Sequence, residues 1–339
     1  MSVPDIQIVD LVWIDSTARG LTASAAANVK SVLAAGKKNY VLINASTDFA
    51  RQASEAVCGH ATVIPVPRSG GLVLRELLIL WLAVKAMLAR QKIVYTSWLP
   101  RLAFFPLVFP IESRIHVHDL NIFRKRIYDD DFAQPSFLSR AHQFVSIKRA
   151  TQACCFSRSV QKQIAKIRGG AIPSLIRQHV HVPPLAGAAN SKQRMAAIFL
   201  DSRSYKGAWM LDRLYSSGKN FELVVVGDIT ESKANRLRAK GVHVRSLRPS
   251  DNEKFQLLSE ASCVIFASKY EGFGIPPREA AAVGTPSLIA RRAALMDIPK
   301  SLSISIDDFA NDIDLDEISR LAAKIDRMEL KAWAQAYVD

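Results

Sequence analysis

Short apolar runs alternate with longer helical stretches along the first half of this chain of 339 residues. The runs with the length and composition of strands are residues 6–14, 40–43, 61–66, 92–95 and 114–119. Between them, residues 22–35 and 72–90 have the composition of helices. Strands that alternate with helices in this way are typical of a parallel sheet covered by helices, so we predict an α/β fold.

The same pattern resumes after a change in composition, where Pro183, Pro184 and the small polar residues 188–191 are typical of a linker. Because 339 residues are many for a single core, we predict two domains, residues 1–187 and 188–314. A C-terminal helix over 315–339 is able to cross back to the first domain. The later runs of strand character are residues 196–200, 221–226, 242–245 and 264–266, and a helix is expected over 252–261.

Residues 263–290 hold the most informative loop of the chain, between two runs of buried-strand character. The loop cannot continue a strand, because Gly272 and Gly274 permit unusual dihedral angles and two prolines without amide donors follow. Pro277 is suited to the first turn of a helix over 278–283, which Gly284 would cap. The sequence therefore predicts a strand, a glycine-bearing loop, a short helix and a second strand.

This loop has the features of a site for an anionic ligand that carries sugar hydroxyls. A helix beginning there directs free N–H groups and the positive end of its dipole toward the loop, which favours an anion. Glu271 and Glu279 flank the loop, and carboxylates accept hydrogen bonds from sugar hydroxyls. Loop and glutamates together suggest a nucleotide-sugar site. An ordinary helix cap, with Glu271 merely solvated, is the alternative.

The segment SKYEGFGIPPREAAAVGTPSLIA resembles the signature of the family 4 retaining glycosyltransferases. That resemblance implies the GT-B fold, in which two Rossmann-like domains face each other across a cleft. It also implies that Glu271 faces the donor sugar, that Glu279 holds the ribose of the nucleotide, and that loop amides meet the diphosphate. The loop residues concerned are Gly272, Phe273 and Gly274.

The same resemblance gives donor-binding roles to two further loops. In the family, a basic pair after the first strand of the second domain clamps the diphosphate, and Arg203 and Lys206 match it. Lys206 matches better, because a glycine and a predicted helix follow it. Gly20 stands where the family has a glycine-containing loop near the diphosphate, although an ordinary turn glycine fits equally well. Ile229 and Leu247 stand where the family often has glycines, so no base-binding residue is assigned.

A histidine at the end of a predicted strand is the candidate from the first domain. Strand alternation places both His116 and His118 on one face of the strand. Ligands of open α/β sheets gather at the carboxyl ends of the strands. The segment RIHVHDLN resembles the family's His-Asp motif, which implies that His118 lies near the reacting sugar. We expect no role for His116, since two histidines without a third ligand make a poor metal site.

The net charge of +14 predicts anionic partners. Residues 138–168 hold seven basic and no acidic residues. A solvated basic face, attachment to an anionic membrane and capture of a lipid diphosphate acceptor all fit this stretch. Nucleic acid is not expected, because the chain has no recognition motif and its basic residues are not interleaved with aromatic ones.

No stretch of the chain is expected to span a membrane. Residues 72–88 are apolar but carry Arg75, Glu76 and Lys85, so we predict an amphipathic helix packed on a sheet. The apolar residues 101–111 either pack in the core, line an acceptor cleft or touch lipid. The N-terminus lacks the features of a signal peptide and the four cysteines lack zinc spacing. A reducing, cytoplasmic setting at the inner face of the membrane is therefore expected.

An acidic triplet, Asp129 to Asp131, could hold a divalent ion beside a diphosphate. The preceding residues are basic and do not form an apolar strand, so we predict a solvated loop. We expect no metal and no other cofactor, with a nucleoside diphosphate sugar as co-substrate.

Together these features predict a retaining glycosyltransferase that moves a sugar from a nucleoside diphosphate sugar to a hydroxyl of a glycan or lipid-linked acceptor. Its expected setting is cell-surface glycan or polysaccharide assembly. Two alternatives stay open: a GT-B sugar-nucleotide epimerase, and a non-catalytic GT-B scaffold that acts through its basic face.

Overall fold

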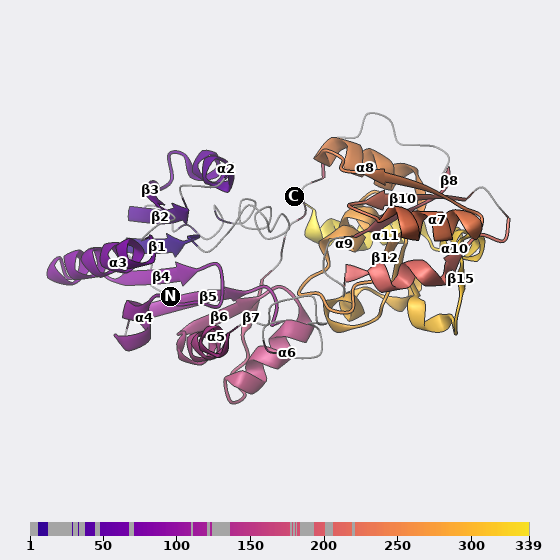
Figure 1. The fold of residues 1–339 in the computed structure, drawn as a ribbon. Coiled ribbons are helices and arrows are strands. Elements are labelled where there is room, and N and C mark those ends of the chain that lie inside the picture. Colours follow the sequence, from indigo (N-terminus) through magenta and orange to yellow (C-terminus); the bar gives the residue numbers. More distant parts are fainter. Residues whose placement is uncertain are drawn as a thin grey trace. The chain divides into compact units, whose positions relative to one another are not determined.

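The computed structural model describes residues 6–12, 29, 33, 38–44, 48–67, 71–109, 111–120, 123, 136–176, 178, 180, 182–183, 193–200, 206–218 and 221–338. The chain divides into two compact units. Unit 1 is Met1–Leu120 with Pro135–His179, and unit 2 is Asn121–Gln134 with Val180–Asp339. Each unit is built on a parallel sheet of its own (Figure 1).

Unit 1 contains a seven-stranded sheet in the order β3-β2-β1-β4-β5-β6-β7, in which all neighbours are parallel. The strands are β1 (Ile6–Asp10), β2 (Lys38–Asn44), β3 (Thr62–Val66), β4 (Ile93–Ser97), β5 (Glu112–Val117), β6 (Gln152–Cys155) and β7 (Ser174–Leu175). The central strand β1 is buried along its whole length. Such burial on both faces is the reason that central strands of parallel sheets read as apolar runs without alternation.

With the right-handed crossovers that are usual between parallel strands, the strand order of unit 1 puts α3, α4, α5 and α6 on one face of the sheet and α2 on the other. The helices are α2 (Asp48–Val57), α3 (Gly71–Leu88), α4 (Phe104–Val108), α5 (Phe137–Arg149) and α6 (Arg158–Ile167). Serine hydroxyls cap two of them, because Ser136 accepts from the N–H of Ser139 and Ser157 from that of Val160. No helix in the described ranges is long and apolar enough to cross a bilayer.

Unit 2 contains a six-stranded parallel sheet in the order β11-β10-β8-β12-β13-β14. Its strands are β8 (Gln193–Phe199), β10 (Phe221–Val226), β11 (Val242–Leu247), β12 (Ala261–Phe266), β13 (Ser287–Ile289) and β14 (Ser303–Ser305), while β9 (Leu214–Tyr215) pairs with β15 (Ile313–Asp314). Its α-helices are α7 (Glu231–Ala239), α8 (Asp251–Glu260), α9 (Ile275–Ala282), α10 (Leu315–Ala322) and α11 (Arg327–Ala334). Its 3₁₀ helices are η3 (Ala208–Arg213), η4 (Ala293–Asp297), η5 (Lys300–Leu302), η6 (Ile306–Asp308) and η7 (Gln335–Tyr337).

The predicted order of strands is confirmed, with boundaries that shift by a few residues. The prediction of a single helix over 315–338 is wrong, since α10 and α11 are separate helices. Asp326 divides them, because its carboxylate caps α11 by accepting from the N–H groups of Met328 and Glu329. Within unit 2, α11 packs on α9. The predicted helix over 22–35 and the predicted linker fall mostly outside the described residues.

Candidate functional site

The loop between β12 and α9 forms as its glycines and prolines predict. Gly274 ends the loop in the left-handed region, with a φ of 79°, and caps α9. A Cβ at this position would lie 2.6 Å from a methyl carbon of Leu295, so the site requires glycine. α9 begins at Ile275, three residues before the predicted start, because its first turn accommodates both prolines. The loop therefore leads directly into a helix N-terminus, as an anion site requires.

Arg278 on α9 holds the backbone of this loop from inside the protein. Its guanidinium donates to the carbonyl oxygens of Phe273 and Gly274, the second at 3.1 Å. In a trans peptide the N–H points away from the C=O, so the N–H groups of Gly274 and Ile275 turn to the side of the loop opposite Arg278. Because the next two residues are prolines without N–H groups, these two amides are the donors with which α9 begins.

Aromatic rings enclose the guanidinium of Arg278, which is fully buried. Its central carbon lies 3.9 Å from the ring centre of Phe273, 5.1 Å from that of Tyr337 and 5.8 Å from that of Trp333. Burial lowers the pKa of Arg278, and Tyr337 and Asp297 offset part of that effect. The C-terminal segment thus supports the loop. Sequence reasoning missed Arg278, because two of the three rings around it, those of Trp333 and Tyr337, lie more than fifty residues away along the chain.

Two predicted donor-site residues, Lys206 and Glu271, are in contact. The Lys206 ammonium donates to the Glu271 carboxylate, and the two side chains are 17% and 12% exposed. The position of Lys206 depends on the segment that follows it, where Gly207 has a φ of 108° and Trp209 Nε1 donates to the carbonyl of Ala267 at 2.9 Å. That bond joins η3 to the end of β12, so cation and carboxylate meet at the carboxyl edge of the sheet.

Glu279 lies on α9 with a nearly buried carboxylate. One of its oxygens accepts a hydrogen bond of 2.8 Å from Lys254 Nζ on α8. Burial raises the pKa of Glu279, and Lys254 offsets part of that effect. Burial alone would lower the pKa of Lys254, but Glu279 raises it. The pair leaves acceptor capacity on Glu279 for a hydroxyl. Lys254 was missed by sequence reasoning because its partner lies on another helix.

Unit 1 places His118 directly after β5, in an aromatic cluster. His118 stacks on Phe156 with ring centres 4.6 Å apart. The ring centre of Trp98 lies 4.3 Å from that of His116 and 5.9 Å from that of His118. Both histidines therefore lie on one face of the strand, as alternation predicts. Burial lowers the pKa of His118 to about 3 and that of His116 to about 4, which keeps both rings neutral at physiological pH. His118 Nε2 is buried and has no hydrogen-bond partner within the described ranges.

Three other predictions fall outside the described residues: Gly20, Arg203 and the acidic triplet Asp129 to Asp131. Over the described part of the chain, no cluster of His, Cys, Asp or Glu is arranged to hold a metal ion. The described candidate groups of unit 2 are thus a cation and a carboxylate in contact, a second carboxylate, and two outward N–H groups. Such a set can bind an anion and sugar hydroxyls together.

Residues 205–326, which include all of these groups, match the family model "Glycosyl transferases group 1". A stretch of 37 residues, 11% of this chain, is 54% identical to the ORF378 protein of Acidianus filamentous virus 2 (isolate Italy/Pozzuoli), which is named as a glycosyltransferase. That stretch spans 10% of the viral protein.

Solved structures resemble the chain over nearly its whole length. The lipopolysaccharide outer core galactosyltransferase WaaB, in its apo form, has a TM-score of 0.63 at 11% identity, over 98% of this chain and 95% of that one. Sucrose-phosphate synthase from Thermosynechococcus elongatus has a TM-score of 0.60 at 14% identity, over 99% of this chain and 95% of that one. These likenesses confirm the predicted GT-B fold with two Rossmann-like halves. Fold and domain match together support a glycosyltransferase.

Proposed function

We propose that this glycosyltransferase is a retaining enzyme of the family 4 type, which moves a sugar from a nucleoside diphosphate sugar to an acceptor hydroxyl. The observation that carries the proposal is the contact between Lys206 and Glu271, which stands in the loop three residues before Gly274. A nucleoside diphosphate sugar presents an anion and a hydroxyl-bearing ring next to each other. A cation next to a carboxylate is complementary to that pair of features.

In this proposal the departing diphosphate meets the Lys206 ammonium and the two outward N–H groups of the loop. Arg203 and Gly20 are proposed to complete this part of the site. Oriented donors of this kind stabilise developing negative charge without reorganising at the moment of reaction. When the donor binds, Lys206 exchanges part of its contact with Glu271 for a phosphate oxygen. The freed carboxylate oxygen then accepts a hydroxyl of the donor sugar.

The ribose and the acceptor side involve the other two candidates. Glu279, held by Lys254, is proposed to accept a ribose hydroxyl. His118 is proposed to hydrogen-bond the reacting sugar through its unpartnered Nε2, as a neutral ring. Retention follows if the acceptor oxygen attacks the anomeric carbon from the face that the diphosphate leaves. The new glycosidic bond then replaces the sugar–phosphate bond, and the acceptor proton passes to a phosphate oxygen of the leaving group.

We propose a glycan or lipid-linked glycan as acceptor, cell-surface glycan or polysaccharide assembly as the setting, and a cytoplasmic location at the inner face of the membrane. The reaction is expected to need no divalent ion, since protein cations and amides supply the positive charge.

The test begins with a thermal-shift panel of nucleoside diphosphate sugars, followed by turnover of the best donor with and without candidate acceptors. We expect one donor to raise the melting temperature, acceptor-dependent release of nucleoside diphosphate in EDTA, and NMR coupling that shows retained anomeric configuration. An inverted product would overturn the proposed stereochemistry. Conversion of the donor to another nucleotide sugar without acceptor would favour the epimerase, and stabilisation without turnover would favour the scaffold.

A further inference from the structure

The outward face of α3 is apolar and exposed over the whole helix. Eight large apolar side chains on this helix are between 39% and 82% exposed. At 100° per residue they fall within one stripe about 140° wide, and 18 residues make a helix about 27 Å long. They are Val73, Leu74, Leu77, Leu80, Trp81, Val84, Met87 and Leu88. The expected amphipathic helix is therefore wrong in one respect, because its outer face is not polar.

The opposite face of α3 is fixed to the sheet, so this exposure is not the result of a detached helix. Arg75 Nε donates to the Asp10 carboxylate at 2.7 Å, and its terminal nitrogen donates to the Tyr95 hydroxyl at 2.9 Å. All three side chains are buried, together with Ile79 and Leu82. The charge that interrupts the apolar sequence thus anchors the inner face, while the outer stripe remains exposed.

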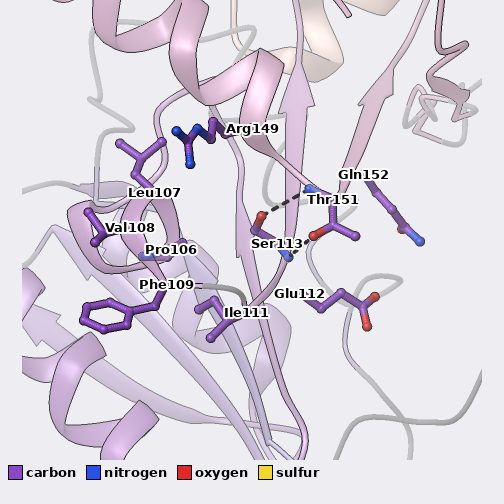
Figure 2. Close-up of a pocket in the computed structure, with 10 residues that line it drawn as sticks. All are labelled: Pro106, Leu107, Val108, Phe109, Ile111, Glu112, Ser113, Arg149, Thr151 and Gln152. Carbon is purple, nitrogen blue, oxygen red and sulfur yellow. Dashed lines mark hydrogen bonds between the residues drawn. The ribbon is translucent and has the colours of Figure 1, made fainter.

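The apolar surface continues onto α4, which contacts α3. The N–H of Phe104 donates to the Glu76 carboxylate at 2.8 Å, and Phe104, Val108 and Phe109 are exposed. Beside α4 lies a pocket of about 580 Å³ (Figure 2). One side is apolar, formed by α4 and its neighbours, and the Arg149 side chain lies beside it. Glu112, which pairs with Arg114 at 2.9 Å, also lines the pocket. The pocket thus joins an apolar wall to the side chain of Arg149.

Exposed cations lie on the side of this apolar surface where α5 ends. Lys148 and Arg149 are exposed at the end of α5, and Lys162 and Lys166 are exposed on the neighbouring α6. Within the described ranges, no acidic side chain pairs with any of the four. Lys85, the one cation on the outer side of α3, lies 5.0 Å from the ring centre of Trp81.

We infer that α3, α4 and the end of α5 form a docking surface for an anionic phospholipid bilayer. The stripe on α3 enters the boundary between headgroups and acyl chains, while Arg149 and Lys148 bind lipid phosphates. A helix that lies in the membrane surface with flanking cations binds in this way without crossing it. This inference does not depend on the reaction that the enzyme catalyses.

Charge favours a bilayer over a second copy of this chain as the occupant. A symmetric pair would bring identical cations together across the interface, where like charges repel. The pocket also differs from an acceptor site. Glu112 and Thr151, which line it, lie at the amino ends of β5 and β6, whereas His118 follows the carboxyl end of β5. Glu112 and His118 are six residues apart along the strand, which separates them by about 20 Å.

The test is flotation of the full chain with vesicles of phosphatidylcholine alone or with phosphatidylglycerol. We expect flotation only with the anionic vesicles, weakened in high salt. The double variant Leu77→Gln with Trp81→Gln should bind about tenfold to hundredfold less, and Lys148→Gln with Arg149→Gln about tenfold less. Two matched controls, Met296→Gln with Met328→Gln and Lys300→Gln with Lys324→Gln, replace exposed residues of unit 2 and should float as wild type.

Circular dichroism and thermal melting verify that each variant is folded. Failure of the wild-type chain to float with anionic vesicles would overturn the inference, as would equal flotation of the α3 variant. Light scattering gives the remaining outcome. A wild-type dimer that Leu77→Gln with Trp81→Gln converts to a monomer, without vesicle binding, would assign the surface to a second copy instead.

Discussion

Each unit brings opposite charges together at the carboxyl edge of its parallel sheet, but the two arrangements differ in access. In unit 1, Arg75, Asp10 and Tyr95 are sealed from solvent and satisfy one another. Burial lowers the pKa of Arg75, but Asp10, Tyr95 and Glu76 together raise it above its ordinary value. In unit 2, Lys206 and Glu271 remain partly exposed. The sealed cluster is committed to structure, whereas the accessible pair can exchange partners with a ligand.

The largest expected effect comes from breaking the sealed cluster. Arg75→Met leaves Asp10 buried without its cation, which should cost unit 1 about 3–5 kcal/mol of unfolding free energy. Urea denaturation measures the loss. The matched control is Arg51→Met, which removes an exposed pair with Glu55 and should cost less than about 1 kcal/mol. Equal effects of the two variants would contradict the distinction between sealed and accessible charges.

The accessible pair should behave in the opposite way. Lys206→Ala should lower kcat with the identified donor by about 10²–10³-fold, because the cation that we propose stabilises the leaving diphosphate is lost. Its unfolding free energy should fall by less than that of Arg75→Met, since Glu271 keeps some contact with solvent whereas Asp10 has none. Lys324 is exposed between α10 and α11. The variant Lys324→Ala serves as control and should keep wild-type rates. Wild-type kcat in Lys206→Ala would remove this residue from the site.

Arg278 sharpens the comparison, because it is a buried cation in unit 2, the unit that also holds the accessible pair. Arg278→Met keeps the bulk of the side chain but releases the carbonyls of Phe273 and Gly274, so the loop amides lose their fixed orientation. We expect kcat/KM for the donor to fall about tenfold to hundredfold. This effect is smaller than the one expected for Lys206→Ala, because the proposed contact of Lys206 with the diphosphate is kept. The amide NMR signals of Gly274 and Ile275 should shift or broaden in the free protein. Unchanged signals together with unchanged kinetics would show that the loop orients without Arg278.

The smallest expected effect is a pH dependence of stability, which arises from two histidine rings that are neutral in the fold. His116 and His118 have pKa values of about 4 and 3 in the fold, below the ordinary 6.5, so the unfolded chain binds more protons between these values. Stability should therefore fall as pH falls below 6.5, by up to about 1.4 kcal/mol per pH unit for each ring. Urea unfolding of His118→Asn between pH 7 and 5 should show a shallower slope. His243→Gln, at an exposed position on β11, should leave the slope unchanged.

The loop between β12 and α9 could be predicted from sequence because its determinants are local. Two glycines and two prolines restrict their own backbone, and the structure places the loop and helix where they indicate. The contact between Lys206 and Glu271 was also within reach, since both follow strands of one sheet and meet at its carboxyl edge. Arg203 and Gly20 stay predictions, because they lie outside the described residues.

The remaining features depend on contacts between distant segments. Trp333 and Tyr337 help to bury Arg278, and Lys254 finds its partner Glu279 on the next helix. The outer face of α3 could not be assigned, because its apolar residues surround the helix and show no clear period. For such a helix, the pattern alone does not distinguish a face that packs on the sheet from a face that remains exposed.

The support that Trp333 and Tyr337 give to Arg278 has a consequence for how the protein is made. The signature loop leaves the ribosome about sixty residues before these two rings, so it is synthesised before it can be braced. A nascent chain stopped between Ala290 and Trp333 would carry every residue of the motif and still expose a guanidinium that the folded protein encloses. The signature loop is thus braced only after Tyr337 has been made, and termination before Trp333 should yield a product that quality-control proteases can recognise as unfinished.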